Sequence, residues 1–196
     1  GSYDYRLREV LLGCFRGFLV FRQLFAPEEV QTLLQACLEV INKTGREEAL
    51  TRGSGYGMRS FLERHSVLTD WLSDDRIYSI PEKLLGPDFL LETNGGFVWW
   101  GDTLWHGGFA TEESLGSTYE IAKVAMYFDS LSKDDGCLRV IPGTHRRPFG
   151  EWVKPQQTGK DRESKPFGVP QEDVPCVPLE SEPGDVIVFT ERVFHS

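Results

Sequence analysis

Long apolar segments and clustered cysteines are both missing from this chain of 196 residues. A membrane-spanning helix needs about 18 consecutive apolar residues, and because no such run occurs we expect no membrane partner. The first ten residues, GSYDYRLREV, lack the apolar core of a secretion signal, which favours a cytoplasmic location. The four cysteines are far apart and form no Cys-x-x-Cys pair, which argues against a zinc ribbon and predicts reduced thiols.

Positive charge is also scarce. The chain has 21 Lys and Arg against 30 Asp and Glu, a formal net charge of −9, and this balance opposes binding to a nucleic-acid polymer. A small anion held by one or two arginines remains compatible with it. With 40% hydrophobic residues, the length suits one sizeable core, so we expect residues 1–196 to form a single domain.

The order of patterns along the chain predicts helices first and short strands afterwards. A helix is expected from Pro27, with an apolar face at three- and four-residue steps, and a second helical passage over 70–85, interrupted by Pro81 and ended by Gly86. Residues 42–65 and 151–175 are polar and predict a loop and a lid-like insertion. β-rich segments follow Gly86: FLLETN, FVWWGDTLWH, YEIAKVAMYFDSL, GCLRVIPGT, PCVPLE and GDVIVF. The fold class indicated is mainly β, a sandwich or small barrel, with flanking helices.

Two of the four histidines close predicted strands. His106 ends WWGDTLWH, and His195 lies near the end of GDVIVFTERVFHS. Side chains at strand ends are held rigidly and converge at the mouth of a barrel, which makes them suitable metal ligands. Either histidine alone would more often be a structural residue.

Four segments in this order resemble one enzyme family: GFLVFRQLFAPEEV, GDTLWH, KVAMYFDSLSKDDGCLRVIPGTHR and PGDVIVFTERVFHS. They are similar to the phytanoyl-CoA dioxygenase-like branch of the non-haem Fe(II)/2-oxoglutarate-dependent oxygenases, and the resemblance covers most of the chain. It implies a double-stranded β-helix, a jelly-roll of the cupin type. It also implies that His106 and His195 hold Fe(II), which uses 2-oxoglutarate and O2.

The family holds iron with a His-x-Asp pair and a distal histidine, but this chain has Gly108 where the aspartate is expected. Residues two apart on a strand point to the same side, so position 108 faces the metal. The resemblance then extends to halogenases, in which chloride binds iron in place of the carboxylate. We therefore predict an enzyme of natural-product biosynthesis that chlorinates an unactivated aliphatic C–H bond of a small metabolite, with His106, Gly108 and His195 as catalytic positions. Gly108 and Phe109 would line the halide pocket.

Three alternatives stay open. The runner-up is a hydroxylase of the same family, natural or carrying an Asp-to-Gly change. An acid near His106 would then act as third ligand, with Asp102, Glu112 and Glu113 as candidates. The remaining alternative is a binding domain without iron. The substrate is expected to be a nucleotide or amino-acid derivative, and a carrier protein is not favoured because the chain itself is acidic.

Further residues receive expectations from the resemblance. Thr103 and Lys123 are expected to bind the cofactor 2-oxoglutarate, although an exposed strand threonine and a solvated lysine are the structural alternatives. Trp105 and Arg192 are expected at the substrate, with a core position as the alternative for the tryptophan. The arginine that anchors 2-oxoglutarate in the family follows the distal histidine by about ten residues and is expected beyond Ser196, together with a final strand. Mobile internal loops are also expected to be missing from the sequence.

Overall fold

The computed structural model describes residues 16–44, 50–52, 55–99, 103–108, 120–157 and 165–196. The chain divides into two compact units. The first contains Gln23–Gly101 together with Gly1–Asp4, and the second contains Tyr5–Arg22 and Asp102–Ser196. Each unit is described by itself, and the expectation of a single domain stays a prediction.

The helix predicted from Pro27 is present in the first unit as α2 (Pro27–Thr44). Glu28 and Glu29 lie in its first turn, where negative charge is favourable to the helix dipole. The buried face of α2 is formed by Val30, Leu33, Ala36 and Val40. This face contacts α3 (Ser66–Leu72), which follows a 3-10 turn at Leu62–Arg64.

The second predicted helical passage is divided, but not where the proline indicated. α3 ends at Leu72 and α4 (Asp75–Leu85) begins three residues later, with Pro81 inside α4. The break lies at Asp74 because its carboxylate accepts a hydrogen bond from Arg76 N at 2.9 Å and caps α4. Gly86, with φ of +95°, ends α4 as expected.

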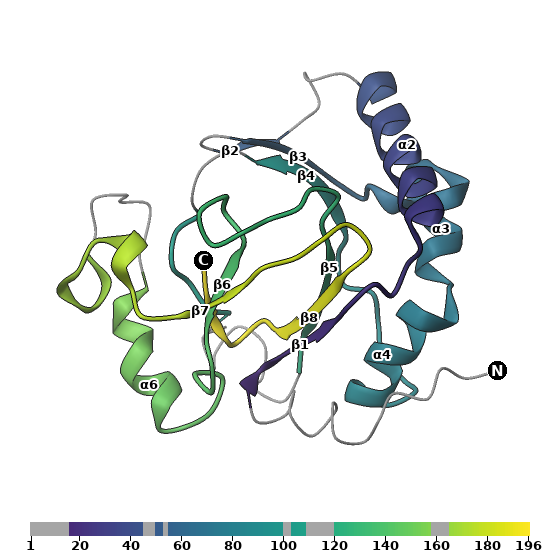
Figure 1. Cartoon of the computed structure of the whole chain (residues 1–196). Helices are drawn as coiled ribbons and strands as arrows, with labels where there is room; N and C mark the ends of the chain where they lie inside the picture. Colours follow the sequence, from purple (N-terminus) through teal and green to yellow (C-terminus); the bar gives the residue numbers. More distant parts are fainter. Residues whose placement is uncertain (1–15, 45–49, 53–54, 100–102, 109–119, 158–164) are drawn as a thin grey trace. The chain divides into compact units, whose positions relative to one another are not determined.

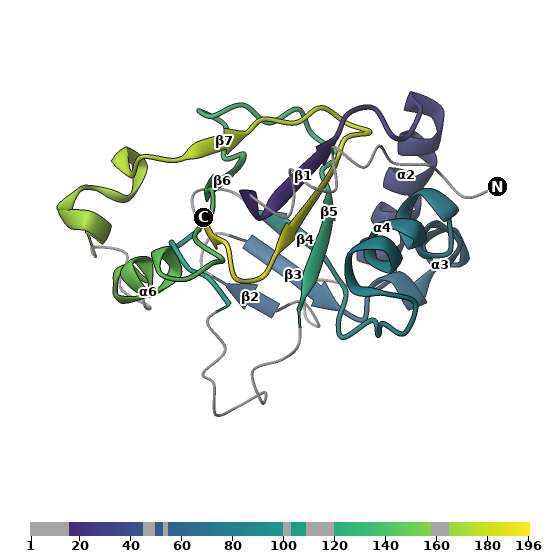
Figure 2. The same ribbon diagram turned by 90° about the horizontal axis from the view of Figure 1, so that it is seen from below.

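A three-stranded antiparallel sheet completes the first unit. It joins β2 (Leu50–Arg52), β3 (Gly55–Arg59) and β4 (Gly95–Trp99) in that order (Figure 2). The prediction of a loop over 42–65 is therefore wrong in this part, because pairing with the distant β4 overrides the glycine-rich local sequence. The Phe97 ring packs directly on Gly57, where it would clash with a Cβ.

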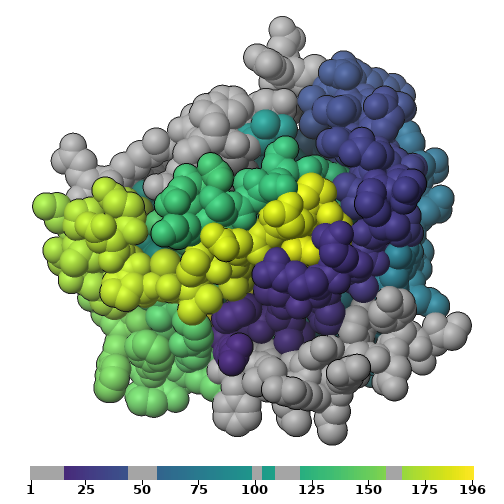
Figure 3. Space-filling model, in the orientation of Figure 1, coloured from purple at the N-terminus to yellow at the C-terminus, as the bar shows by residue number. Residues whose placement is uncertain are grey.

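The second unit contains two antiparallel sheets. In the first of them, β8 (Val186–Thr190) lies between β1 (Phe18–Phe21) and β5 (Ala122–Met126), as Figure 1 shows. Residues far apart in the sequence therefore meet here, and the surface in Figure 3 shows yellow C-terminal residues beside the dark purple of β1. Four of the five residues of β8 are buried, as expected for the apolar run DVIVF.

The second sheet of this unit carries the histidines. Its order is β7 (Val177–Leu179), β6 (Leu138–Ile141) and β9 (Phe194–His195). An antiparallel bridge from His195 to His106 extends it by one position. The segment FLLETN, predicted as a strand, is not one, because residues 89–94 form no ladder.

The described parts of the polar segment 151–175, residues 151–157 and 165–175, contain short helices in place of the predicted lid-like loop. The segment begins within α6 (Phe149–Val153) and continues through 3-10 turns at Lys154–Gln156, Pro166–Gly168 and Gln171–Asp173. Apolar residues of this segment, Val153 and Val174, pack with Trp105 and Phe194 in one core cluster. Those contacts, which no local pattern announces, hold the segment against the rest of the unit.

Cys37, Cys137 and Cys176 are free thiols, and burial raises the pKa of Cys37 to about 11. Among the described residues, no helix is both long and apolar enough to cross a membrane.

Candidate metal centre

His106 and His195 lie side by side in the second unit. Their backbones form a pair of hydrogen bonds, His106 N to His195 O and His195 N to His106 O, both 2.8 Å long. The ring centroids are 4.2 Å apart, with the ring planes at 51°. The sequence interval of 89 positions between them is thus closed by strand pairing, as the metal-site prediction required.

Each imidazole is oriented by a backbone carbonyl two residues earlier. His106 Nδ1 lies 2.7 Å from Leu104 O, and His195 Nδ1 lies 2.7 Å from Val193 O. A carbonyl oxygen only accepts, so in each ring Nδ1 carries the proton and Nε2 retains its lone pair. A ring fixed in this way through its second nitrogen is the usual arrangement of a metal-binding histidine.

Both rings are held in the neutral form that metal binding needs. Burial and, to a smaller extent, the neighbouring His106 lower the pKa of His195 to about 3, against the opposing effect of the hydrogen bond to Val193. Burial also lowers the pKa of His106, and the positive charge of Lys123 acts in the same direction. The donor set therefore fits a divalent cation of borderline hardness such as Fe(II), which binds imidazole readily.

β9 is fixed from behind by a buried threonine. Thr144 is fully buried, and its hydroxyl donates to Ile141 O at 2.7 Å while accepting from Phe194 N at 2.8 Å. This side chain, the threonine of the IPGTH segment, connects the turn after β6 to the residue before His195. It therefore holds the backbone that carries one of the two imidazoles.

Trp105 belongs to the core. Its side chain is fully buried, stacks on Phe194 with centroids 5.5 Å apart, and donates from Nε1 to Gln171 O at 3.0 Å. The expectation that it contacts a substrate is corrected accordingly. An indole in this position stabilises the strand ends under the two histidines instead.

Lys123 reaches the centre from β5. It pairs across the sheet with Phe189, and its Nζ lies 5.6 Å from the centroid of that ring. The Phe189 ring in turn meets His195 edge-on at 5.0 Å. Burial lowers the pKa of Lys123, and its ammonium forms an ion pair with Glu191. A cationic group is thus placed beside the imidazoles, where an anionic cofactor would need it.

Gly108 follows His106 closely and faces the side chain of Glu191. Its N–H donates to Glu191 O at 2.6 Å. A Cβ built on Gly108 would lie 2.8 Å from Glu191 Cδ and 2.9 Å from Oε1, and still closer to Cγ. Nevertheless, the described residues contain no group of three His, Cys, Asp or Glu side chains arranged to hold a metal ion.

The remaining predicted residues are placed less closely around the imidazoles. Thr103 is exposed, and its carbonyl accepts a hydrogen bond from the Ser196 hydroxyl at 2.7 Å. Arg192 Nη1 lies 3.3 Å from Glu120 Oε1. Their cofactor and substrate roles stay predictions. Phe109 and the three acids considered as alternative ligands, at positions 102, 112 and 113, lie outside the described residues.

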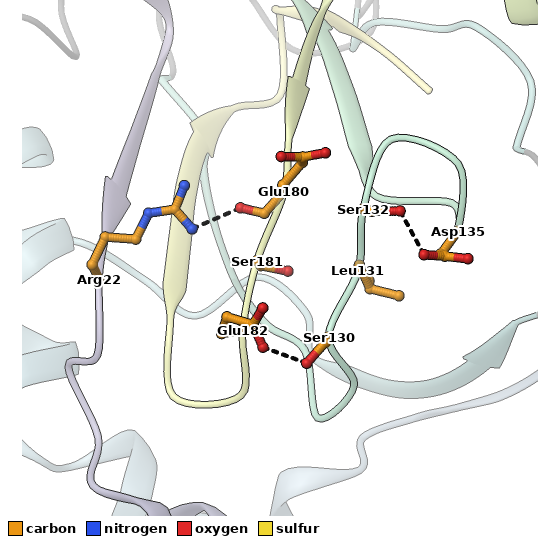
Figure 4. A pocket seen from close by; sticks show the side chains of 8 residues that line it. All are labelled: Arg22, Ser130, Leu131, Ser132, Asp135, Glu180, Ser181 and Glu182. Atoms are coloured by element: carbon orange, nitrogen blue, oxygen red, sulfur yellow. Dashed lines mark hydrogen bonds between the residues drawn. The ribbon is translucent and has the colours of Figure 1, made fainter.

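A surface hollow of about 320 Å3 elsewhere in the second unit is lined by none of the predicted site residues (Figure 4). Arg22 extends along it and donates to Glu180 O at 2.7 Å and to Asp185 Oδ2 at 2.6 Å. Its other lining residues are Ser130, Leu131, Ser132, Asp135, Ser181 and Glu182. The Arg22 pairing gives this hollow a structural role in joining β1 to the turn before β8.

Known proteins that are similar to this chain point to one family. The family described as phytanoyl-CoA dioxygenase (PhyH) matches residues 111–196. Ectoine dioxygenases of Bordetella bronchiseptica and Bordetella parapertussis are 26% identical over 194 residues, covering 90% of this chain and 61% of theirs. The resemblance to the phytanoyl-CoA dioxygenase family is confirmed. The chain spans only 61% of the length of these curated relatives.

Solved structures agree on the fold. The carbocyclase SnoK of nogalamycin biosynthesis, described as non-haem and α-ketoglutarate-dependent, has a TM-score of 0.72 at 18% identity, covering 100% of this chain and 79% of SnoK. EctD from S. alaskensis, solved with bound Fe, has a TM-score of 0.69 at 17% identity, covering 99% and 73%. HygX from Streptomyces hygroscopicus, with nickel and 2-oxoglutarate, gives 0.72 at 17%, covering 98% and 80%.

The sequence did not predict the places of Glu191 beside Gly108 and of Thr144 behind β9. The acids at positions 102, 112 and 113 lie near His106 in the sequence, whereas Glu191 is brought to Gly108 by pairing between distant segments. A signal was present, because Glu191 lies four residues before His195 in TERVFH. Thr144 was visible only as part of a family motif, and its role follows from two hydrogen bonds that no spacing predicts.

Proposed function

We propose that this chain carries the iron site of an Fe(II)/2-oxoglutarate-dependent oxygenase acting on an aliphatic C–H bond of a small molecule. The observation that supports it is the pair of neutral imidazoles 4.2 Å apart, each with Nδ1 tied to a carbonyl. The similarity to ectoine dioxygenases, and to EctD with 2-oxoglutarate and 5-hydroxyectoine, supports a small polar substrate. We further infer that the two sheets of the second unit form part of a double-stranded β-helix.

The protein's own part in this reaction is to bind and orient. Nε2 of His106 and of His195 would hold the metal, and the carbonyls of Leu104 and Val193 fix both rings through Nδ1. When bound, Fe(II) with 2-oxoglutarate supplies the oxidation of the C–H bond by O2, with succinate and CO2 as co-products. Lys123 supplies positive charge for a carboxylate of 2-oxoglutarate.

Hydroxylation is the outcome that the geometry favours. The side chain of Glu191 takes the place beside Gly108 that an anion would need. Halogenation is the second candidate, favoured by the absence of any side-chain carboxylate at Gly108 itself. The two differ in their dependence on chloride, because a halogenase requires it and a hydroxylase does not.

The test is succinate formation from 2-oxoglutarate under air, with Fe(II) and with either chloride or nitrate as the salt. We expect Fe(II)-dependent succinate that falls at least about 100-fold in His106→Ala and His195→Ala. His65→Gln is the matched control, since His65 belongs to the other unit, where it caps α3. Equal rates in chloride and nitrate support hydroxylation, and a rate that requires chloride supports halogenation. Succinate formation unaffected by either histidine change would refute the iron site.

A further inference from the structure

The space beside Gly108 is occupied by a carboxylate-bearing side chain from another part of the chain. Glu191 Cδ and Oε1 lie 2.8 and 2.9 Å from where the Cβ of residue 108 would be. In an aspartate the carboxylate carbon is bonded directly to Cβ, so the Glu191 carboxylate lies close to the position that an aspartate at 108 would give its own. The Glu191 side chain therefore fills the space that a side chain at position 108 would need.

Two hydrogen bonds fix the main chain of Glu191, and its side chain is partly buried. Glu191 N donates to Ile121 O at 3.0 Å, and Glu191 O accepts from Gly108 N at 2.6 Å. Three side-chain torsions then decide where the carboxylate points. It is ion-paired with Lys123, whose side chain is 39% exposed and therefore has room to withdraw.

We propose that Glu191 is the third protein ligand of the metal and takes the role of the aspartate that the family has at the position of Gly108. This inference rests on the proposed function, because it needs a metal at His106 and His195. On metal binding the carboxylate would exchange its ion pair with Lys123 for a bond to the cation. Charge favours the exchange, since two neutral imidazoles leave a divalent ion without an anionic partner.

The proposal also gives a reason for glycine at position 108. Any side chain there would meet Glu191 Cγ and Cδ, so the glutamate would have to move. An aspartate at 108 and a glutamate at 191 are then alternative ways to bring one carboxylate to the same metal. Each excludes the other sterically.

The experiment is anaerobic titration of the full chain with Co(II), followed by calorimetry and by the visible absorption of the bound ion. Glu191→Gln is expected to weaken Co(II) binding by roughly 10- to 100-fold and to change the absorption spectrum, because one ligand is lost. Glu120→Gln is the matched control. It removes the same charge from an acid that pairs with Arg192, and its affinity should stay within about twofold.

Two double variants separate ligation from simple charge balance. If Glu191 only neutralises Lys123, Glu191→Gln with Lys123→Gln regains the original affinity; if it is a ligand, this double variant stays weak. Conversely, Gly108→Asp combined with Glu191→Ala moves the carboxylate to position 108 and should bind Co(II) at least about 10-fold more tightly than Glu191→Ala alone. Unfolding midpoints without metal verify that each variant is folded.

The outcomes distinguish a failure of the proposed function from a failure of the ligand role of Glu191. If the unaltered chain binds no Co(II), the proposed function itself fails. If it binds Co(II) but Glu191→Gln binds equally well, or charge balance alone restores affinity, or the folded Gly108→Asp/Glu191→Ala variant gains nothing, the ligand role of Glu191 is overturned while the histidine site stands.

Discussion

The imidazole of His195 is constrained on several sides. Its backbone pairs with His106, its Nδ1 is tied to Val193 O, and the edge of Phe189 packs against its ring. Few orientations are left to the ring, so little rotamer entropy is lost when a metal binds. At the residue scale, the centre is therefore already organised around the two imidazoles and remains adjustable at Glu191 and Lys123.

Trp105 tests whether the aromatic residues near the site serve stability or substrate binding. Trp105→Phe removes the hydrogen bond to Gln171 O and part of a fully buried ring, and we expect it to lower the free energy of unfolding by about 1–3 kcal/mol. Urea denaturation measures this loss. The KM for substrate should stay unchanged. A raised KM with unaltered stability would instead mean that Trp105 contacts the substrate.

At the scale of elements, the position of β9 depends on Thr144. Thr144→Val keeps the shape but leaves Phe194 N without its acceptor, which should cost about 1–3 kcal/mol of unfolding free energy and weaken metal binding at His195. Thr144→Ser retains the hydroxyl and should restore most of the metal affinity. Denaturation and Co(II) titration together check this. Loss of stability with unchanged metal affinity would confine Thr144 to a purely structural role.

In the first unit, Arg76 of α4 connects that helix to α2. Its Nη2 donates to Glu29 Oε1 at 2.6 Å and to Asp74 Oδ2 at 2.7 Å, and its guanidinium lies 4.1 Å from the Phe25 ring centroid. Hydrogen bonding to Arg76 lowers the pKa of both carboxyls below their ordinary values of 4.5 and 3.8. Their contribution to stability is thus present above about pH 4.5 and is lost as the pH falls further.

Arg76→Gln should therefore destabilise the protein by about 1 kcal/mol at pH 7 and by less at pH 3. Thermal unfolding of both proteins at the two pH values measures the difference. Lys133→Gln, which removes a positive charge from the other unit, serves as the control and should show no such convergence. A destabilisation by Arg76→Gln that is the same at pH 3 would contradict the ion-pair explanation.

Some elements were predictable from local sequence, and others were not. The start of α2 follows from Pro27 with two acids behind it, and β8 follows from an apolar run between turn residues. The strands β2 and β3 could not be predicted from TRGSGYGMRS, because β3 depends on pairing with β4, about 40 residues later, and β2 in turn pairs with β3. The histidine pair was predictable because both residues belong to family motifs. Glu191 was not, because only the pairing of distant segments brings it to Gly108.

At the scale of the whole molecule, metal binding should be linked to folding. The metal binds only where His106 and His195 are brought together by strand pairing, so it stabilises the folded state alone. At about 100 times the dissociation constant, the stabilisation is about 2.7 kcal/mol. Thermal unfolding with and without Co(II) should show this increase for the unaltered chain and none for the variant with both histidines changed to alanine. An equal increase in both proteins would mean that the metal binds elsewhere.

The most direct test is an anaerobic crystal structure of the chain with Fe(II), recorded at the iron absorption edge. The account predicts one anomalous peak about 2.1 Å from Nε2 of both His106 and His195, with the Glu191 carboxylate turned from Lys123 toward it. A peak away from the two imidazoles, or none at saturating Fe(II), would contradict the central claim.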